Sequence, residues 1–239
     1  MTYCAAILTE EGLVFASDSR TNAGVDQVSS FRKMRIYECE NDRALVVLSS
    51  GNLSVTQNAI NALERSALRG ETPNIWNCTS MLQAAEILSR RLQEVKARDG
   101  PYLQQNNIEV SANFIIGGQI GTETPRLFLL KSGGDICEAN ATKPFMQIGE
   151  TKYGKPILDR VIHSGTALRD AVKCMLISFD STMRSNVSVG LPIDLCSYRR
   201  DTLKIHLRRC ITEEDPYFRT IHRQWSEGLR QVFAGLPSP

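Results

Sequence analysis

A threonine directly follows the first methionine, and a threonine at that position can do chemistry. If Met1 is removed, Thr2 carries a free α-amine and a β-hydroxyl on one residue. The hydroxyl can act as a nucleophile while the amine, whose reference pKa is about 7.7 to 8.0, acts as the general base. The N-terminal residues show no basic stretch followed by an apolar stretch, so we expect no signal or transit peptide and a fold that starts here.

A hairpin predicted at the start of the chain brings a carboxylate close to this threonine. Two strand-like runs flank the turn TEEG. If Thr9 stands opposite Gly12, the numbers of paired residues sum to 21, and Tyr3 faces Asp18. We therefore expect Thr2 and Asp18 to be neighbours, because a slip of one residue would turn the whole strand over.

A lysine completes the candidate group. Lys33 lies at the start of the next expected strand and can come beside Asp18. Its cation would favour an ionised Thr2 hydroxyl, and the Asp18 carboxylate would hold that cation in place. The alternative is that Thr2 starts a strand, Asp18 starts a turn and Lys33 is an exposed charge, and the residue types alone favour this alternative.

The elements that must position these residues follow from the hydrophobic periodicity. Strand patterns cover 2–9, 12–18, 33–39, 43–49, 110–117, 126–131, a short run ending at Cys137, 187–198 and 202–207. Helical patterns lie between Asn52 and Gly70, over 79–98, over 152–162, from about Thr166 to Phe179, and after the EEDP segment.

The helical patterns also predict which faces are apolar and where one helix ends. The first helix should bury Leu53, Ile60, Leu63 and Ala67; the last should line up Phe218, Ile221, Trp225, Leu229 and Val232. The second helix is expected to end at Asp99, Gly100 and Pro101.

The order of these elements predicts the fold class. Blocks of strands alternate with helix pairs, without linker-like or low-complexity segments, so residues 1–239 are expected to form a single domain. Several strands are apolar on both faces, which indicates an α+β, four-layer αββα sandwich: two antiparallel sheets packed together and covered outside by helices. The single strand and helix alternation of a Rossmann-type sheet is absent.

Composition excludes several other functions. A net charge of +2 gives no broad reason to expect nucleic acid or a membrane as partner. The basic segment 199–209 alternates with apolar residues, as in a half-buried strand. Seven scattered cysteines and three histidines lack metal-ligand spacing, so we expect reduced thiols, a cytoplasmic location, and no metal or cofactor. The IIGGQIG run lacks the lysine and helix start of a phosphate-binding loop.

Three motifs carry a resemblance to a known family. The segments VFASDSRTNAG, FRKM and LSSGNLSVTQN resemble the β subunits of the proteasome and its bacterial relatives, which are N-terminal-nucleophile hydrolases. The likeness covers essentially the whole chain and extends to proteasome-like bacterial subunits without a propeptide. It implies the N-terminal-nucleophile hydrolase fold and a chain that assembles with copies of itself.

The resemblance also assigns roles to residues. It implies that Thr2 is the nucleophile after loss of Met1, that Lys33 lowers the pKa of its hydroxyl, and that Asp18 pairs with the lysine. The backbone N–H of Gly51, just before the first helix, matches the family's oxyanion-hole donor.

Further positions match less closely. Asn22 and Gly24 would border the substrate, which the family binds as an added strand. Asp180 matches the acidic residue near the terminus, and Ser185 an accompanying hydroxyl. Gly149, Glu150 and Thr151 stand where the family has a Gly-Ser-Gly turn.

The function expected from these residues is hydrolysis of peptide or amide bonds through an acyl-enzyme. One alternative is an amidohydrolase for a specialised non-protein amide. Another is an inactive subunit that serves assembly. The assembly can be a closed ring or an open helix, and the sequence does not indicate an ATPase partner.

Overall fold

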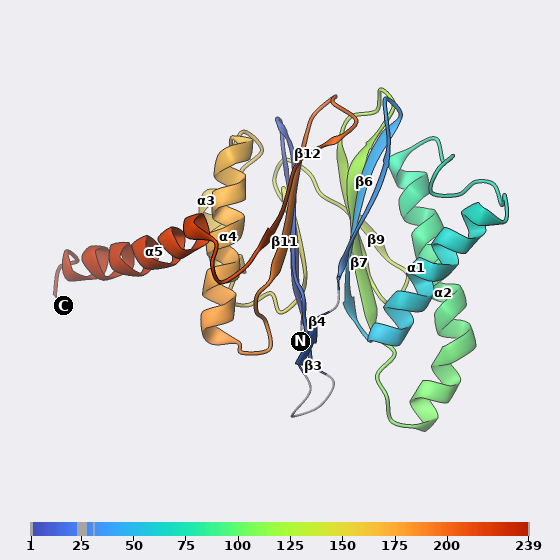
Figure 1. Cartoon of the computed structure of the whole chain (residues 1–239), viewed down its shortest axis with the longest axis horizontal. Helices are drawn as coiled ribbons and strands as arrows, with labels where there is room; N and C mark the ends of the chain where they lie inside the picture. The colour runs from blue at the N-terminus through green and yellow to red at the C-terminus, as the bar shows by residue number, and fades with distance from the viewer. Residues whose placement is uncertain (1, 23–27, 31, 239) are drawn as a thin grey trace.

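Two antiparallel sheets lie face to face and helices cover their outer sides in the computed structural model, which describes residues 2–22, 28–30 and 32–238 (Figure 1). The first sheet has the strand order β10-β1-β2-β11-β12, and the second has the order β5-β6-β7-β8-β9. Both are five-stranded, and a separate small hairpin joins β3 to β4. The four-layer α+β architecture expected from the sequence is confirmed.

The first sheet is built around the hairpin at the start of the chain. Its strands are β10 (Phe145–Gly149), β1 (Tyr3–Thr9), β2 (Gly12–Asp18), β11 (Ile193–Arg199) and β12 (Ile205–Ile211). The predicted register is confirmed, since Thr9 pairs with Gly12 and Cys4 with Ser17. The edge strand β10, which the sequence patterns did not reveal, pairs with the other side of β1.

The second sheet has β6 and β7 at its centre. Its strands are β5 (Met34–Cys39), β6 (Arg43–Gly51), β7 (Ala112–Ile120), β8 (Arg126–Leu130) and β9 (Ile136–Glu138). The short strands β3 (Arg20–Asn22) and β4 (Val28–Ser30), also absent from the sequence-based expectation, form their hairpin below the two sheets in Figure 1.

The last two strands begin later than expected. Residues 187–192 precede β11 instead of belonging to it, and they include Gly190 and Pro192, which are poor strand residues. Asp201 and Leu203 adopt positive φ of 64° and 49°, so this turn delays the start of β12. Within β12 the side chains of His206 and Arg208 are exposed, as the alternating pattern predicts.

Three apolar layers explain why so many strands lack a polar face. One cluster fills the space between the sheets and includes Leu13, Phe15 and Ile115. A second joins the outer face of the second sheet to the first two helices. A third cluster joins the outer face of the first sheet to the last three helices. A strand between two such layers buries both of its faces, and all seven residues of β2 are accordingly buried.

Helix α1 (Leu53–Leu68) starts at the predicted cap, with the Asn52 side chain accepting a hydrogen bond from the Val55 N–H. Its predicted apolar face is partly wrong, because Leu53 is exposed and Ala67 only half-buried. The residues that pack on the sheet are Val55, Thr56, Ala59, Ile60, Leu63 and Ser66. Small and polar residues share this face, so hydrophobicity alone did not locate it.

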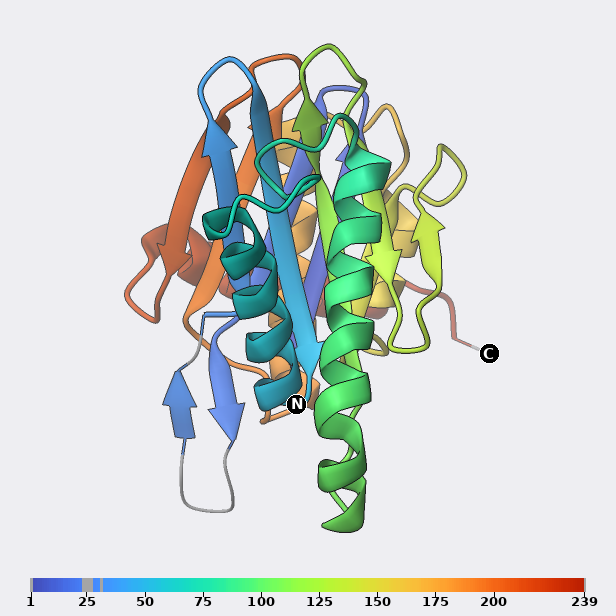
Figure 2. The ribbon, with the colours of Figure 1, turned by 90° about the vertical axis from the view of Figure 1, so that its right-hand side faces the viewer.

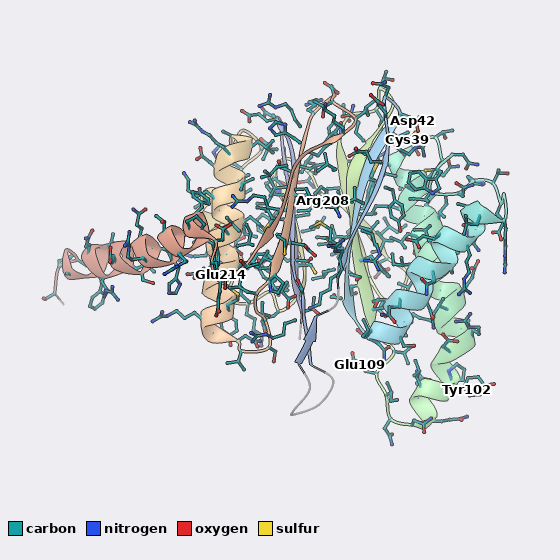
Figure 3. All side chains as sticks on the ribbon, viewed as in Figure 1. Cys39, Asp42, Tyr102, Glu109, Arg208 and Glu214 are labelled. Carbon is teal, nitrogen blue, oxygen red and sulfur yellow. The ribbon has the colours of Figure 1, made fainter. Side chains whose placement is uncertain are left out.

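Helix α2 (Met81–Gln105) does not end at Asp99 as predicted but continues through Gly100 and Pro101. A proline inside a helix removes one backbone hydrogen bond. Here packing compensates for that loss, since Gly100 is buried and Leu103 packs against the core cluster beneath α1 and α2. Figure 3 places Tyr102 on the last turns of α2, which extend beyond the end of the sheets.

The remaining helices cover the first sheet, and one extends away from it. They are α3 (Lys155–Val161), α4 (Leu168–Ser185) and α5 (Pro216–Ala234). Asp215 caps α5 through a hydrogen bond from the Phe218 N–H. The expected apolar line along α5 is buried only at Phe218 and Ile221, because the helix then projects away from the sandwich (Figure 1).

Candidate active site

A buried ion pair forms the centre of the candidate site. Lys33 Nζ lies 2.8 Å from Asp18 Oδ1, and both side chains are at least nine-tenths buried. Lys33 also donates a hydrogen bond of 2.7 Å to the carbonyl oxygen of Arg20. The backbone N–H of Tyr3 donates to the same Asp18 oxygen over 3.0 Å, as the hairpin register requires. The structure therefore brings Asp18 and Lys33 to the residue that follows Thr2.

The electrostatics of this pair depend on its burial. Loss of hydration raises the pKa of the Asp18 carboxyl above its ordinary value of 3.8. The Lys33 ammonium and the Tyr3 N–H oppose that rise, because both stabilise the carboxylate form. A charge with these partners is fixed in place, since a buried ion that leaves its counter-ion faces a large desolvation cost.

Thr2 is held from the side of β10. Its carbonyl oxygen accepts a hydrogen bond of 2.7 Å from the backbone N–H of Glu150. Gly149 has φ of +82°, and a Cβ there would lie 1.9 Å from the Thr2 carbonyl oxygen. Only glycine permits this close approach. The turn of Gly149, Glu150 and Thr151, which departs from the family pattern, thus lies directly against Thr2.

The residue after Thr2 is anchored more deeply. The Tyr3 hydroxyl forms hydrogen bonds of 2.6 Å with Ser178 Oγ and with Gln147 Nε2, and its ring packs on Phe179. Burial raises the pKa of the Tyr3 hydroxyl to about 12, so it stays protonated. These contacts fix the start of β1 against α4 and β10.

Gly51 lies at the end of β6, at the same end of the sandwich as Thr2. Cys4 Sγ is 3.5 Å from the carbonyl oxygen of Ser49, so the last residues of β6 lie beside the first residues of β1. Figure 2 shows β6, which Gly51 ends, leading into the start of α1. Gly51 has φ of +108°, and a Cβ there would lie 2.2 Å from the Ser111 carbonyl oxygen. A side chain is therefore excluded.

The structure does not connect the other predicted site residues to the Lys33–Asp18 pair through contacts among the described residues. Asp180 faces α5, where its Oδ1 is 2.5 Å from His222 Nδ1, and its contacts among the described residues do not reach Asp18 or Lys33. Ser185 is exposed at the end of α4. Asn22 pairs with Val28 in the β3–β4 hairpin, and Gly24, like Met1, lies outside the described residues.

One residue that contacts the turn of Gly149, Glu150 and Thr151 was missed at the sequence level. Asn186, the C-cap of α4, donates a hydrogen bond of 2.9 Å from Nδ2 to Glu150 Oε2. Glu150 thus connects the end of α4 to the backbone of Thr2. The signal that was present is the run FMQIG before Glu150, whose strand pattern marks β10.

The architecture is that of a proteasome-type β subunit with the N-terminal-nucleophile hydrolase fold. No protein-family model matches the sequence, and no curated protein does. Solved structures match over the whole chain.

Three of these structures show the similarity. Anbu (ancestral β-subunit) from Yersinia bercovieri is 46% identical, with a TM-score of 0.93, over 100% of this chain and 98% of that one. The Anbu complex from Pseudomonas aeruginosa, described as a helical assembly, is 44% identical, with a TM-score of 0.94, over 100% and 98%. Anbu from Hyphomicrobium sp. strain MC1 is 41% identical, with a TM-score of 0.92, over 100% and 99%. The chain belongs to the Anbu family.

In the part of the chain that the structure describes, no helix is both long and apolar enough to cross a membrane. The same residues contain no cluster of three or more His, Cys, Asp or Glu side chains placed to hold a metal ion.

Proposed function

We propose that this chain is a threonine-type hydrolase that cleaves peptide or amide bonds after loss of Met1. The observation that carries the proposal is the buried ion pair of Lys33 and Asp18, which binds the backbone N–H of Tyr3, the residue after Thr2. A lysine held beside a threonine hydroxyl favours its ionised form. Buried ion pairs are weak evidence for stability by themselves, which makes a role in the reaction the better explanation for this one.

The reaction proceeds in two halves. In the first, Thr2 Oγ1 attacks the substrate carbonyl carbon while its proton passes to the α-amine, and the N–H of Gly51 stabilises the oxyanion. The carbon–nitrogen bond then breaks, and the leaving amine takes that proton. In the second half, water attacks the ester and gives a proton to the α-amine. The ester bond breaks, the proton returns to Oγ1, and a carboxylic acid is released.

Mass spectrometry of the purified protein tests this proposal. We expect the intact mass to lack one methionine. After incubation with a peptide that carries a C-terminal electrophile, we expect the mass to increase by that of one bound peptide, attached at Thr2. A protein that retains Met1 and takes up no electrophile would support the inactive structural subunit instead. Hydrolysis of small amides but not of peptides would indicate the specialised amidohydrolase.

The pH profile should report two ionisations. Below the pKa of the Thr2 α-amine, the logarithm of the rate at which Thr2 captures the electrophilic peptide should increase with pH with a slope of about one. The reason is that only the neutral amine is a base. The folded-state pKa of Asp18 lies above 3.8. As the pH falls through it, the carboxylate charge that holds Lys33 is lost, and the slope should steepen to about two. In Asp18→Asn the second break should be absent; its persistence would show that another group titrates.

We also propose that the chain assembles with copies of itself, since the Pseudomonas aeruginosa relative is described as a helical assembly, and that α5 makes the contact. The second half of α5 carries an exposed apolar face formed by Leu229, Val232 and Phe233, whose exposed fractions are 53%, 65% and 79%. Figure 1 shows this half of the helix without a neighbouring element. Such a face on an extended helix favours contact with another subunit.

Negative charge on the apolar face of α5 should dissociate the assembly. Leu229→Glu combined with Phe233→Glu places two carboxylates on the apolar side of α5, and we expect sedimentation velocity to show smaller species at the same protein concentration. Gln231→Glu, on the opposite side of the helix, should leave the assembly intact. Unchanged sedimentation of the double variant would exclude α5 as the contact.

A further inference from the structure

A groove on the outer face of the first sheet takes no part in the candidate active site. It is formed by the β1–β2 turn, the first turns of α4, strands β11 and β12, and the start of α5. Its volume is about 590 Å³. Pockets for small molecules commonly measure about 300 to 1,000 Å³. In the part of the chain that the structure describes, none of the lining residues is hydrogen-bonded to Asp18 or Lys33.

A buried hydroxyl group, that of Ser197, lines this groove. On β11, Leu195 packs on the outer side of the sheet, whereas Cys196 and Tyr198 pack between the two sheets. Since side chains alternate along a strand, the Ser197 side chain points outwards, into the groove. Ser197 is only 2% exposed, and its hydroxyl has no hydrogen-bond partner among the described residues. A polar group in this position is available to a ligand.

The exposed part of the lining carries positive charge. Arg169, on the first turn of α4, and Arg199, at the end of β11, both line the groove. Within the described residues, neither guanidinium has an ion pair or a side-chain hydrogen bond. The lining has one carboxylate, that of Glu11, whose Oε2 already accepts a hydrogen bond of 2.8 Å from the Leu168 N–H. The groove therefore has more cationic donors than acidic acceptors.

The groove also leaves apolar surface uncovered. Its apolar lining comes from α4, β12 and α5 and consists of Leu168, Val172, Leu207 and the ring of Tyr217, with Ala167 beside them. Val172 and Leu207 are only half-buried, and Tyr217 is 42% exposed. Covering such surface with an apolar group removes it from water, which is favourable.

The hydroxyl and one of the cations are placed to bind the same ligand. Strand β11 pairs with β2 without interruption up to Arg199, so its side chains alternate regularly. Ser197 and Arg199 thus lie on the same face of β11, about 6 to 7 Å apart along the strand. A ligand of a few carbon atoms spans that distance.

We propose that this groove binds an organic carboxylate that has a compact apolar body and a second polar group. Arg169 and Arg199 bind the carboxylate through charge-assisted hydrogen bonds, and the Ser197 hydroxyl binds the second polar group. The apolar body covers Leu207 and Tyr217. A free small acid and the C-terminal residue of a peptide share this chemistry. The inference does not depend on the hydrolase proposal.

Calorimetric titration of the full-length protein with N-acetyl-leucine and with N-acetyl-leucinamide tests this proposal. The two probes have nearly the same shape and differ in the negative charge. We expect the acid to bind about tenfold or more tightly than the amide, since a hydrogen bond to a charged group contributes at least that factor. Acetylated Ala-Ala-Leu with a free carboxylate then distinguishes the two sources. Binding at least as tight as that of N-acetyl-leucine indicates a peptide end, and loss of binding indicates a free acid.

Substitutions assign the binding to the groove. Arg199→Glu should remove the preference for the acid, whereas Arg208→Glu, an exposed site of β12 outside the groove, makes the same change in net charge and should keep it. Ser197→Ala removes only the hydroxyl and should weaken the binding of both probes about two- to tenfold. Absence of saturable binding, or equal affinity of the natural protein and Arg199→Glu for the acid, would overturn the proposal.

Discussion

Thr2→Ala is expected to abolish covalent capture of an electrophilic peptide and to lower hydrolysis by about 10⁴-fold or more, because the variant lacks the attacking oxygen. Thr2 makes its observed hydrogen bond through its carbonyl oxygen, which alanine retains. The fold should therefore survive. The measurements are intact mass after incubation with the peptide and release of a fluorescent amine from a peptide amide.

A matched variant separates loss of chemistry from loss of structure. Thr2→Ser keeps a hydroxyl on Cβ, so the electrophilic peptide should still modify this variant. If Thr2→Ala is modified at the natural rate, another residue is the nucleophile and the proposed mechanism is wrong. Equal far-ultraviolet circular dichroism of the three proteins should accompany these results.

Lys33→Met is expected to lower the free energy of unfolding by about 3 to 5 kcal/mol and to remove activity. The substitution leaves the fully buried Asp18 carboxylate without its cation. Urea denaturation at one fixed protein concentration measures the stability, since assembly makes the apparent stability concentration-dependent. The rate of covalent capture measures the effect on Thr2.

The double variant Asp18→Asn with Lys33→Met tests whether the pair serves the reaction. It replaces both charges by neutral groups of similar size, so most of the lost stability should return. Activity should not return, because no cation remains beside the Thr2 hydroxyl. Recovery of both would mean that the ion pair is structural only, and recovery of neither would point to a packing defect at position 33.

The local geometry of the first hairpin was predictable because its tight turn and side-chain alternation define a register. Counting from Thr9 and Gly12 correctly placed Tyr3 against Asp18. For Lys33 the sequence left two alternatives open, an exposed charge or a partner of Asp18, and the structure shows the ion pair with Asp18. Sequence periodicity sufficed for the hairpin because its contacts depend on strand register, whereas the contact of Asp18 with Lys33 depends on the packing of the two sheets.

Other features depend on partners that lie far away in the chain. The continuation of α2 through Pro101 requires the core beneath Leu103, which local helix signals do not reveal. The bridge between Glu150 and Asn186 joins the end of β10 to the end of α4. The sequence also did not reveal which element Asp180 contacts. Helix α4 packs on β1 through Phe179, and this packing turns Asp180 towards α5.

The location of β1 between β10 and β2 has a consequence for motion. Chain ends commonly fray on fast timescales, and a nucleophile on a frayed end would sample many orientations. Here the residue after Thr2 is the first residue of a strand with partners on both sides, so releasing it requires opening the sheet. Hydrogen exchange at Cys4 and Ala5 should therefore approach the rate of global unfolding. The entropy of orienting the nucleophile is lost when the protein folds, before any substrate arrives.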